Sequence, residues 1–213
     1  MAEYTKQDIK KLCKGRTEEQ KKVIKYFLGS GCLFGGMSDD EYEAMVQAKA
    51  KSMDFKQRAL NKIGLELEQV SVIDPVHFEG YLFDDRNAYA KWGKDRKWRS
   101  SKYQISWIFF SETQVYVYQY TFNMDEDGKE ERTEEYFYQD ITNFSDTSDT
   151  VEKLNLEKIS CKGESIYSRK NVDSNRFALV VPGDKFYCSM EQNEYTHNAI
   201  QGMKSLLRNK KNS

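Results

Sequence analysis

Apolar residues recur every three or four positions through the first 64 residues of the chain, which is the period of an amphipathic helix. Thr5, Thr17 and Ser38 are each followed, three positions later, by an acidic residue or a glutamine, the capping-box pattern of a helix start. Gly64 fits the position just after a helix end. We therefore expect residues 1–64 to form a separate helical segment.

The period changes to two after residue 64, and it is clearest where aromatic residues are densest. Between Tyr103 and Ile141 the alternation predicts three consecutive antiparallel strands, with turns at residues 111–113 and 125–129. In the middle strand, Tyr and Phe occupy one face and Val occupies the other. Both faces of these strands are therefore expected to be covered, which suits a barrel or a sheet packed on a helix.

Weaker patterns on either side of these strands extend the β region. They predict an irregular strand over residues 65–73, a strand over 77–83, a long loop or hairpin over 84–101, a loop over 144–150, one or two weak strands over 154–167 and a strand over 176–181. An amphipathic helix follows from about residue 192 to 208, with Ile200, Met203 and Leu207 on its apolar face. We expect an α+β fold in which residues 65–213 form an antiparallel barrel or sheet of about seven strands, capped by the C-terminal helix.

Several segments of the β region and of the last helix resemble a known family. They are Trp98–Ser101, Trp107–Ser111, Gln114–Tyr118, Glu134–Tyr138 with Asp140 and Ile141, and Ile200–Met203 followed by Leu206–Arg208. Over residues 31–210 the chain is similar to an uncharacterised Firmicutes family of bacterial pleckstrin-homology-like (PH-like) domain proteins. The resemblance implies a PH-like barrel and supplies no catalytic residue. Gly36–Glu43 also resembles SHOCT, a short helical module, which here precedes the barrel.

The composition is polar but differs from that of a disordered chain. Charged residues make up 31% and the mean hydropathy is -0.82, yet 14% of the residues are aromatic, and aromatic side chains bury large areas. The formal net charge of -1 provides no overall attraction for nucleic acid, so we expect no nucleic-acid partner. The first residues lack the basic and apolar segments of a signal peptide, which leads us to expect a cytoplasmic protein.

A charged segment with interleaved aromatic residues lies between residues 84 and 102, where seven basic residues face three acidic ones. Its candidate binding residues are Arg86, Lys91, Trp92, Lys94, Arg96, Lys97, Trp98 and Arg99. Cations that hold phosphate, beside rings that stack or insert, suit the headgroups of anionic lipids. Alternatively, Trp92 and Trp98 pack across a hairpin and the charges are only solvated. The sequence leaves both interpretations open.

Other candidate chemistry is sparse. The His and Cys residues do not have the spacing of a metal site, so we expect no metal and no cofactor. We expect His77 and His197 at the surface or half-buried, and Cys188 in a buried strand. The acidic run that begins at Asp125 is expected to be a solvated hairpin tip. We can name no nucleophile and base that would act together, so we expect no catalytic residue and no enzyme.

These expectations favour a non-catalytic intracellular domain that binds or scaffolds a protein partner of unknown identity, or that associates with itself. The first alternative is peripheral binding of anionic lipid through residues 86–102. The second alternative is a hydrolase of a small substrate with no identifiable catalytic set, since catalytic groups assemble from distant positions in a sequence.

Overall fold

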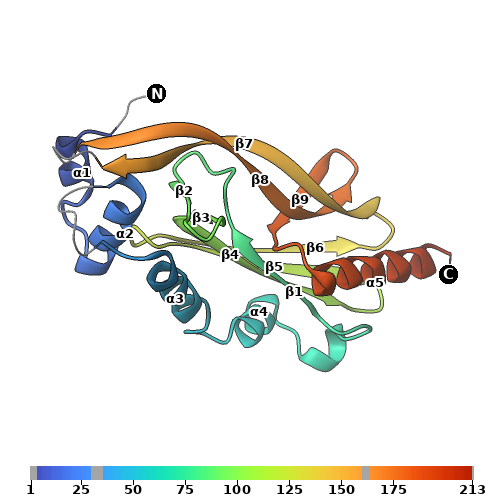
Figure 1. Cartoon of the computed structure of the whole chain (residues 1–213). Helices are drawn as coiled ribbons and strands as arrows, with labels where there is room; N and C mark the ends of the chain where they lie inside the picture. Colours follow the sequence, from blue (N-terminus) through green and yellow to red (C-terminus); the bar gives the residue numbers. More distant parts are fainter. Residues whose placement is uncertain (1–3, 30–35, 160–163, 213) are drawn as a thin grey trace.

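The computed structural model describes residues 4–29, 36–159 and 164–212 (Figure 1). The helices in these residues are α1 (Lys6–Leu12), α2 (Glu18–Leu28), α3 (Asp39–Ala50), α4 (Phe55–Ile63) and α5 (Glu194–Lys211), with a short 3-10 helix at Leu67–Val70. The strands are β1 (Val76–Tyr81), β2 (Ala90–Trp92), β3 (Trp98–Ser100), β4 (Lys102–Phe110), β5 (Gln114–Asn123), β6 (Lys129–Phe137), β7 (Asn143–Ile159), β8 (Ser165–Val181) and β9 (Asp184–Ser189).

The N-terminal helices begin where the capping residues predict. The side chains of Thr5, Thr17 and Ser38 each accept a hydrogen bond from the backbone N–H three residues later. Helix α4 ends at Gly64, whose φ of 78° lies in the left-handed region that glycine enters at little cost. These predictions, which depend on signals only a few residues apart, are confirmed.

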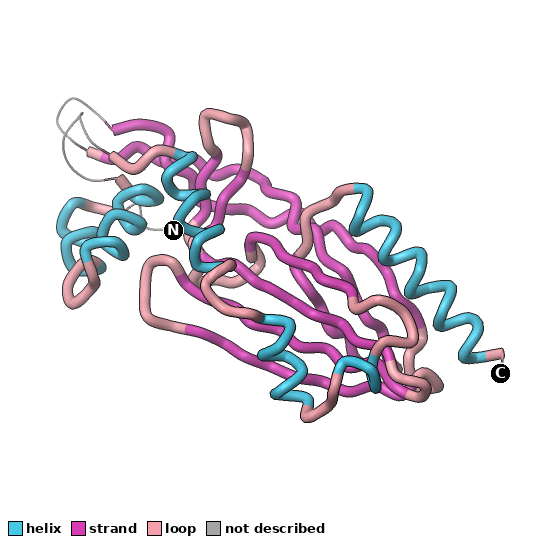
Figure 2. The backbone as a smooth tube through the Cα atoms, turned by 90° about the horizontal axis from the view of Figure 1, so that it is seen from below, coloured by secondary structure: helices cyan, strands magenta, loops and turns pink. Residues whose placement is uncertain are grey.

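The central sheet has the strand order β1-β4-β5-β6, and all its pairings are antiparallel. Strands β4, β5 and β6 follow one another through hairpins, so the prediction from the aromatic alternation is confirmed. Strand β1 corresponds to the strand predicted over residues 77–83. Figure 2 shows these strands side by side, with α3 and α4 on the near side of the sheet.

The two faces of the central sheet pack against different elements. Ile105 and its register partner Tyr120 lie in a core that also contains Phe55 and other residues of the N-terminal helices. Ile108 and its register partner Val117 point the other way, into a second core with residues of β8, β9 and α5. Both faces are therefore covered, as expected, and the N-terminal helical segment packs directly on the β region.

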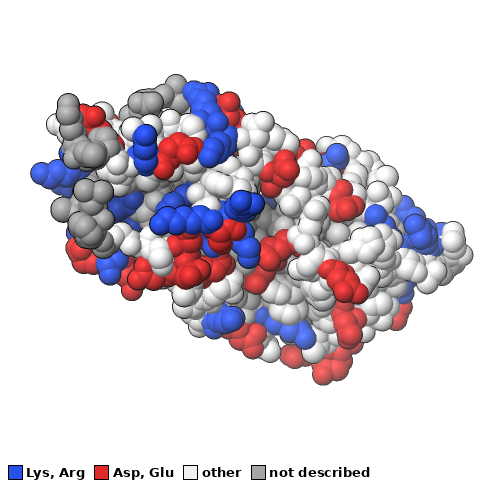
Figure 3. All heavy atoms as spheres, viewed as in Figure 1, with Lys and Arg blue, Asp and Glu red and all other residues white. Residues whose placement is uncertain are grey.

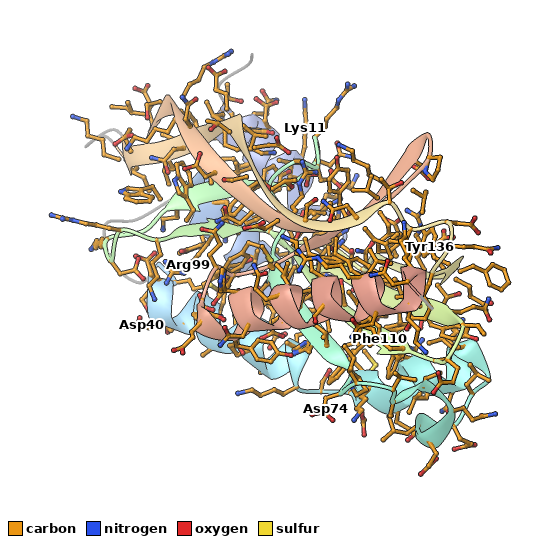
Figure 4. The ribbon with its side chains drawn as sticks, turned by 90° about the vertical axis from the view of Figure 1, so that its right-hand side faces the viewer. Lys11, Asp40, Asp74, Arg99, Phe110 and Tyr136 are labelled. Atoms are coloured by element: carbon orange, nitrogen blue, oxygen red, sulfur yellow. The ribbon has the colours of Figure 1, made fainter. Side chains whose placement is uncertain are left out.

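Helix α5 contributes the apolar face that its sequence predicts. Ile200, Met203 and Leu207 are buried in the second core, together with Phe110 and Val115 of the central sheet. Figure 4 shows the labelled Phe110 beside the ribbon of α5. The helix also packs against β7. Among the helices of the described residues, none combines the length and apolar character needed to cross a lipid bilayer.

The second sheet, in the order β7-β8-β9, corrects one prediction. Residues 144–150 were expected to form a loop, but they lie inside β7, where Asn143 is opposite Val180 and Thr150 is opposite Asp173. Most side chains in this half of the strand are exposed. The strand is therefore made by backbone pairing with β8 and lacks the alternation of apolar residues that marks a half-buried strand in a sequence.

The irregular strand expected over residues 65–73 is also wrong, because part of this segment turns as a 3-10 helix at Leu67–Val70. The backbone N–H of Glu66 donates to the side-chain oxygen of Gln69 at 2.8 Å, and the hydroxyl of Ser71 donates to a backbone carbonyl of the turn at 2.5 Å. Local hydrogen bonds of this kind compete with extended structure, and the spacing of apolar residues does not reveal them.

The expected antiparallel barrel or sheet of about seven strands is found only in part, because the described strands do not form one barrel. Within the described residues, nine strands form three open sheets, namely the central sheet, β7-β8-β9 and a two-stranded sheet of β2 and β3. The additional strands β2 and β3 come from the polar segment 84–101, where hairpin formation was one of two options. The coarser prediction is confirmed: an α+β fold of N-terminal helices, antiparallel strands and a packed C-terminal helix.

Candidate functional site

The basic and aromatic segment folds as the hairpin of β2 and β3. Trp92 and Trp98 are register partners, and the centroids of their rings are 5.4 Å apart. The backbone N–H of Trp92 donates to the side-chain oxygen of Asn155 in β7 at 2.7 Å. Trp98 packs beside a small buried cluster that includes Phe83 and Val172. The two tryptophans therefore pair across a hairpin that is held against the second sheet.

Arg99 lies inside the protein, although the sequence suggested a binding residue. It is 2% exposed, and its guanidinium donates to the two carboxylate oxygens of Asp95 at 2.9 and 2.7 Å. A further hydrogen bond reaches the carboxylate of Glu43 in α3 at 3.2 Å. The hydrogen bond from Arg99 is the main reason that the pKa of Asp95 falls to about 2. Arg99 thus fastens the hairpin to α3 and does not face solvent.

Lys91 is also committed to the N-terminal helices. Its Nζ atom lies 3.6 Å from Oδ1 of Asp39 and 3.6 Å from the centroid of the Tyr26 ring, a cation–π contact. Burial lowers the pKa of Lys91. The backbone N–H of Lys94 donates to the other carboxylate oxygen of Asp39 at 2.7 Å. Asp39, the first residue of α3, therefore anchors both a strand and the turn of the hairpin.

The remaining predicted binding residues lie at the surface. Lys94, Arg96 and Lys97 occupy the turn between β2 and β3 with exposed side chains, and Trp92 beside them is 37% exposed. Figure 3 shows Lys and Arg side chains over this part of the molecule bordered by Asp and Glu side chains. Arg86 is exposed too, but it precedes the hairpin and lines a neighbouring groove.

This groove has a volume of about 1070 Å³ and lies between α1, the segment before β2, the tip of the β5–β6 hairpin and β7. Leu12 and Arg16 line it from the N-terminal helical segment, Arg86 and Tyr89 from the segment before β2, and Lys153 from β7. The groove is therefore built from parts of the chain that are far apart in sequence.

Contacts between these parts hold the groove walls in place. The ring of Tyr4 packs edge-on against Tyr89, with centroids 6.0 Å apart, and against Tyr167 of β8 at 6.2 Å. Nζ of Lys153 donates to the backbone carbonyls of Asp85 at 2.7 Å and Ala88 at 3.3 Å. The segment before β2 is thus tied to β7 on one side and to the N-terminal residues on the other.

Asp125 lines the groove from the tip of the β5–β6 hairpin. It is only 7% exposed, and its Oδ1 atom has no hydrogen-bond partner among the described residues. The neighbouring cations are engaged elsewhere: Nη2 of Arg16 lies 2.8 Å from Oε2 of Glu126, and Nζ of Lys49 donates to the carbonyl of Asn123 at 2.8 Å. Burial raises the pKa of Asp125. The groove therefore contains a desolvated carboxylate that no described side chain pairs with in an ion pair.

The prediction of a solvated acidic tip is therefore wrong for Asp125, whereas Asp127 and Glu130 are exposed as predicted. Besides the burial of Asp125, the tip is docked on the N-terminal segment through Glu126, which pairs with Arg16, and through Asp127, which accepts a hydrogen bond from the Gln20 side chain at 2.7 Å. The two partners, Arg16 between α1 and α2 and Gln20 in α2, are 110 and 107 residues away in the chain. Sequence reasoning missed this part of the site because no local pattern connects such distant residues.

The other titratable candidates have the environments that the sequence predicts. His77 is half-buried and stacks on Trp107, with ring centroids 4.8 Å apart, and His197 is exposed. Cys188 is fully buried, and burial raises the pKa of its thiol to about 12. In the part of the chain that the structure describes, no three His, Cys, Asp or Glu side chains are grouped so as to hold a metal ion.

Comparisons with protein-family models, with curated proteins and with solved structures found no match to this chain. Its function is therefore inferred from the geometry and the chemistry of the groove and of the adjacent hairpin.

Proposed function

We propose that this protein is a non-catalytic binding module whose groove holds an extended segment of a protein partner. The observation that carries the proposal is the groove of about 1070 Å³ with its fixed walls. Sites for small molecules measure roughly 300–1,000 Å³, so this groove is large enough for several residues of a peptide. Walls that are already ordered reduce the entropy lost when a segment binds.

The lining of the groove also suits a protein segment. Rings of Tyr4 and Tyr89 and the apolar side chains of Leu12 and Leu28 lie among charged residues such as Arg86. Aromatic residues and arginine are enriched at protein interfaces, where aromatic side chains supply contact area and charged groups surround them. Among the described residues that line the groove we identify no convergent acid, base and nucleophile, which is why we propose binding and not catalysis.

We also infer that the fold is an open variant of the PH-like arrangement. A four-stranded antiparallel sheet, a three-stranded antiparallel sheet and an amphipathic C-terminal helix follow one another along the chain, and this order supports the inference. The β2–β3 hairpin would then be an insertion between the first two strands of the central sheet. An experimental structure in which α5 packs away from the two sheets would contradict it.

The groove can be tested by selecting peptides against the full chain from a random library of displayed peptides. Asn87 lines the groove with an exposed side chain, so Asn87→Trp should block it without disturbing the core. We expect this substitution to lower the affinity of the selected peptides by at least about tenfold, which corresponds to a loss of roughly 1.4 kcal/mol in binding free energy. Asn198→Trp, on the exposed side of α5, is the matched control and should leave binding unchanged.

Selected peptides that bind the Asn87→Trp protein as tightly as the unmodified protein would show that the groove is not their site. A library that yields no binder would likewise count against a peptide-binding groove.

Anionic lipid is a second candidate ligand, favoured by the turn of the β2–β3 hairpin. Lys94, Arg96 and Lys97 are exposed there next to Trp92, an arrangement in which a ring inserts at a membrane surface while cations contact headgroups. Arg99 and Lys91 are excluded from this surface by their internal ion pairs. The surface is therefore smaller than the sequence suggested.

Sedimentation with vesicles of phosphatidylcholine and phosphatidylserine tests this candidate. Each basic residue at an anionic surface contributes about 1 kcal/mol, so replacing Lys94, Arg96 and Lys97 by Ala should weaken binding roughly hundredfold. Neutral phosphatidylcholine vesicles are the control. If the protein sediments equally with both kinds of vesicle, or with neither, the anionic-lipid candidate is excluded.

A further inference from the structure

We propose that the groove recognises a cation, and that the partner presents it as the side chain of a lysine or arginine seated on Asp125. The inference rests on the proposed function, because it names the chemistry of the segment that the groove holds. The observation behind it is a different one, namely that Asp125, which lines the groove, has a buried carboxylate oxygen without a hydrogen-bond partner among the described residues.

A buried carboxylate with one unpaired oxygen is costly, although a hydrogen bond with the Ser101 side chain partly offsets the burial of Asp125. Removing a charged group from water is unfavourable unless a counter-charge or hydrogen bonds replace the lost hydration, and native proteins rarely leave such groups unpaired. Asp125 is 7% exposed and Oδ1 lacks a hydrogen-bond partner among the described residues. A carboxylate held in this way has a large gain available from a ligand that brings a positive charge and N–H donors.

The surroundings of Asp125 increase its preference for a cation. Glu126, the next residue, adds a second carboxylate to the groove wall, although Arg16 forms an ion pair with it. Tyr89 lines the same wall, and ammonium and guanidinium groups are attracted to aromatic rings. Nζ of Lys49 donates its hydrogen bond to the carbonyl of Asn123 and forms no ion pair with Asp125, so its attraction to that carboxylate acts without direct contact.

The cations that also line the groove do not favour an anionic ligand to the same extent. Lys11 and Arg86 are exposed, so water already solvates their charges. Lys153 is half-buried, but backbone carbonyls accept its hydrogen bonds. Oδ1 of Asp125 is thus the atom of the groove that neither solvent nor a described residue satisfies. Because of these differences in exposure, we expect the ligand to carry a positive charge.

A side chain fits this site better than a bare metal ion does. A divalent cation requires several oxygen, nitrogen or sulfur ligands, and no group of three acidic, His or Cys residues is assembled for one within residues 4–29, 36–159 and 164–212. One carboxylate beside an aromatic ring is instead the set of contacts that an ammonium or guanidinium group uses.

The test is a titration of the full chain, followed by amide chemical shifts in NMR, with three blocked pentapeptides that carry lysine, norleucine or glutamate between glycines. Norleucine keeps the length and apolar stem of lysine without its charge. We expect the lysine peptide to shift the amides of Asp125 and Tyr89 at millimolar concentration and the other two peptides to bind at least tenfold more weakly.

The second part of the test replaces the carboxylate of Asp125. Asp125→Asn keeps the shape of the side chain and removes its charge, so the lysine peptide should lose roughly tenfold to hundredfold in affinity. Asp140→Asn, which changes an exposed carboxylate away from the groove, should lose nothing. An unchanged pattern of amide shifts elsewhere in the Asp125→Asn protein verifies that its fold is intact.

The outcomes separate the two proposals. If library peptides bind the groove but bind Asp125→Asn equally well, or if norleucine replaces lysine without loss, the cation inference is overturned and the peptide-binding groove stands. If Asn87→Trp changes no peptide's affinity, the proposed function fails as well. A lysine peptide that shifts only residues outside the groove also overturns the inference.

Discussion

The hairpin of β2 and β3 and the hairpin of β5 and β6 are both charged in sequence, but their buried charged side chains have different environments in the structure. Both have a charged turn that contains a glycine. In the first, Arg99 and Lys91 are paired with carboxylates of the hairpin and of α3. In the second, Asp125 is buried against the N-terminal residues with one oxygen unpaired.

The difference separates charges that maintain the fold from a charge that is available to a ligand. Arg99 satisfies its buried guanidinium with three hydrogen bonds inside the chain, so its role is structural. Asp125 bears a desolvation cost without an ion pair of its own. Natural proteins accept a local loss of stability at binding sites, where a ligand can compensate for it. The total charge of a segment does not reveal whether a given charged residue is paired inside the protein or available to a ligand.

The largest effect should follow from removing Arg99. Arg99→Ala leaves Asp95 and Glu43 without their shared cation and removes a packed side chain, so the free energy of unfolding should fall by about 3 kcal/mol. This is the lower end of the range for buried pairs, because the two carboxylates are each 35% exposed. Denaturation in urea measures the change.

Lys94→Ala, in the same turn but exposed, is the control for Arg99→Ala and should change stability by less than about 0.5 kcal/mol. Equal effects of the two substitutions would mean that the hairpin does not depend on the ion pairs of Arg99.

The second prediction is an increase in stability, which should follow from removing the charge of Asp125. Burial raises the folded-state pKa of Asp125 above its unfolded value, so the carboxyl group contributes stability at low pH that is lost as the pH rises through the folded pKa. At neutral pH the charged form destabilises the fold. We expect Asp125→Asn to raise the free energy of unfolding at pH 7 by about 1 kcal/mol, and less at acidic pH.

Thermal unfolding of Asp125→Asn and of the control Asp140→Asn, at neutral and acidic pH, measures this effect. A destabilised Asp125→Asn protein at neutral pH would show that the carboxylate is well paired within the chain, and the contrast between the hairpins would disappear.

The smallest effect concerns Asp95, the exposed partner of Arg99. Its folded-state pKa of about 2 is below the ordinary value, so its ion pair contributes stability above the unfolded pKa that is lost as the pH falls from about 4 to about 2. Asp95→Asn should cost about 0.5 kcal/mol at pH 7, because exposed pairs are screened by solvent. Urea denaturation at pH 7 and near pH 2 should give a difference that shrinks with the pH; a constant difference would argue against the pairing.

Only part of the candidate site could be predicted from the sequence. The basic and aromatic composition of residues 84–102 identified the right neighbourhood, and Arg86 lies on the groove itself. The composition could not show that Arg99 is 2% exposed while Lys94, five residues earlier, is exposed. That distinction depends on Asp95 and Glu43, and Glu43 lies 56 residues away in the chain.

What the sequence determined by itself is the local structure that a few neighbouring residues specify. Capping side chains at Thr5, Thr17 and Ser38 start helices because they bind a backbone N–H three residues ahead. Alternating aromatic residues specify β4 and β5, because every second side chain of a strand points to the same face of the sheet. The apolar face of α5 follows from its period for the same reason.

Only the tertiary structure decided how these elements combine. The polar strand β7 exists because β8 pairs with it, and the strands divide into open sheets. The tip of the β5–β6 hairpin, which contains the buried Asp125, packs against the segment of Arg16, although Arg16 and Glu126 are 110 residues apart in the sequence. Contacts across such distances depend on which faces meet in three dimensions. Neither the period nor the charge of any one segment contains that information.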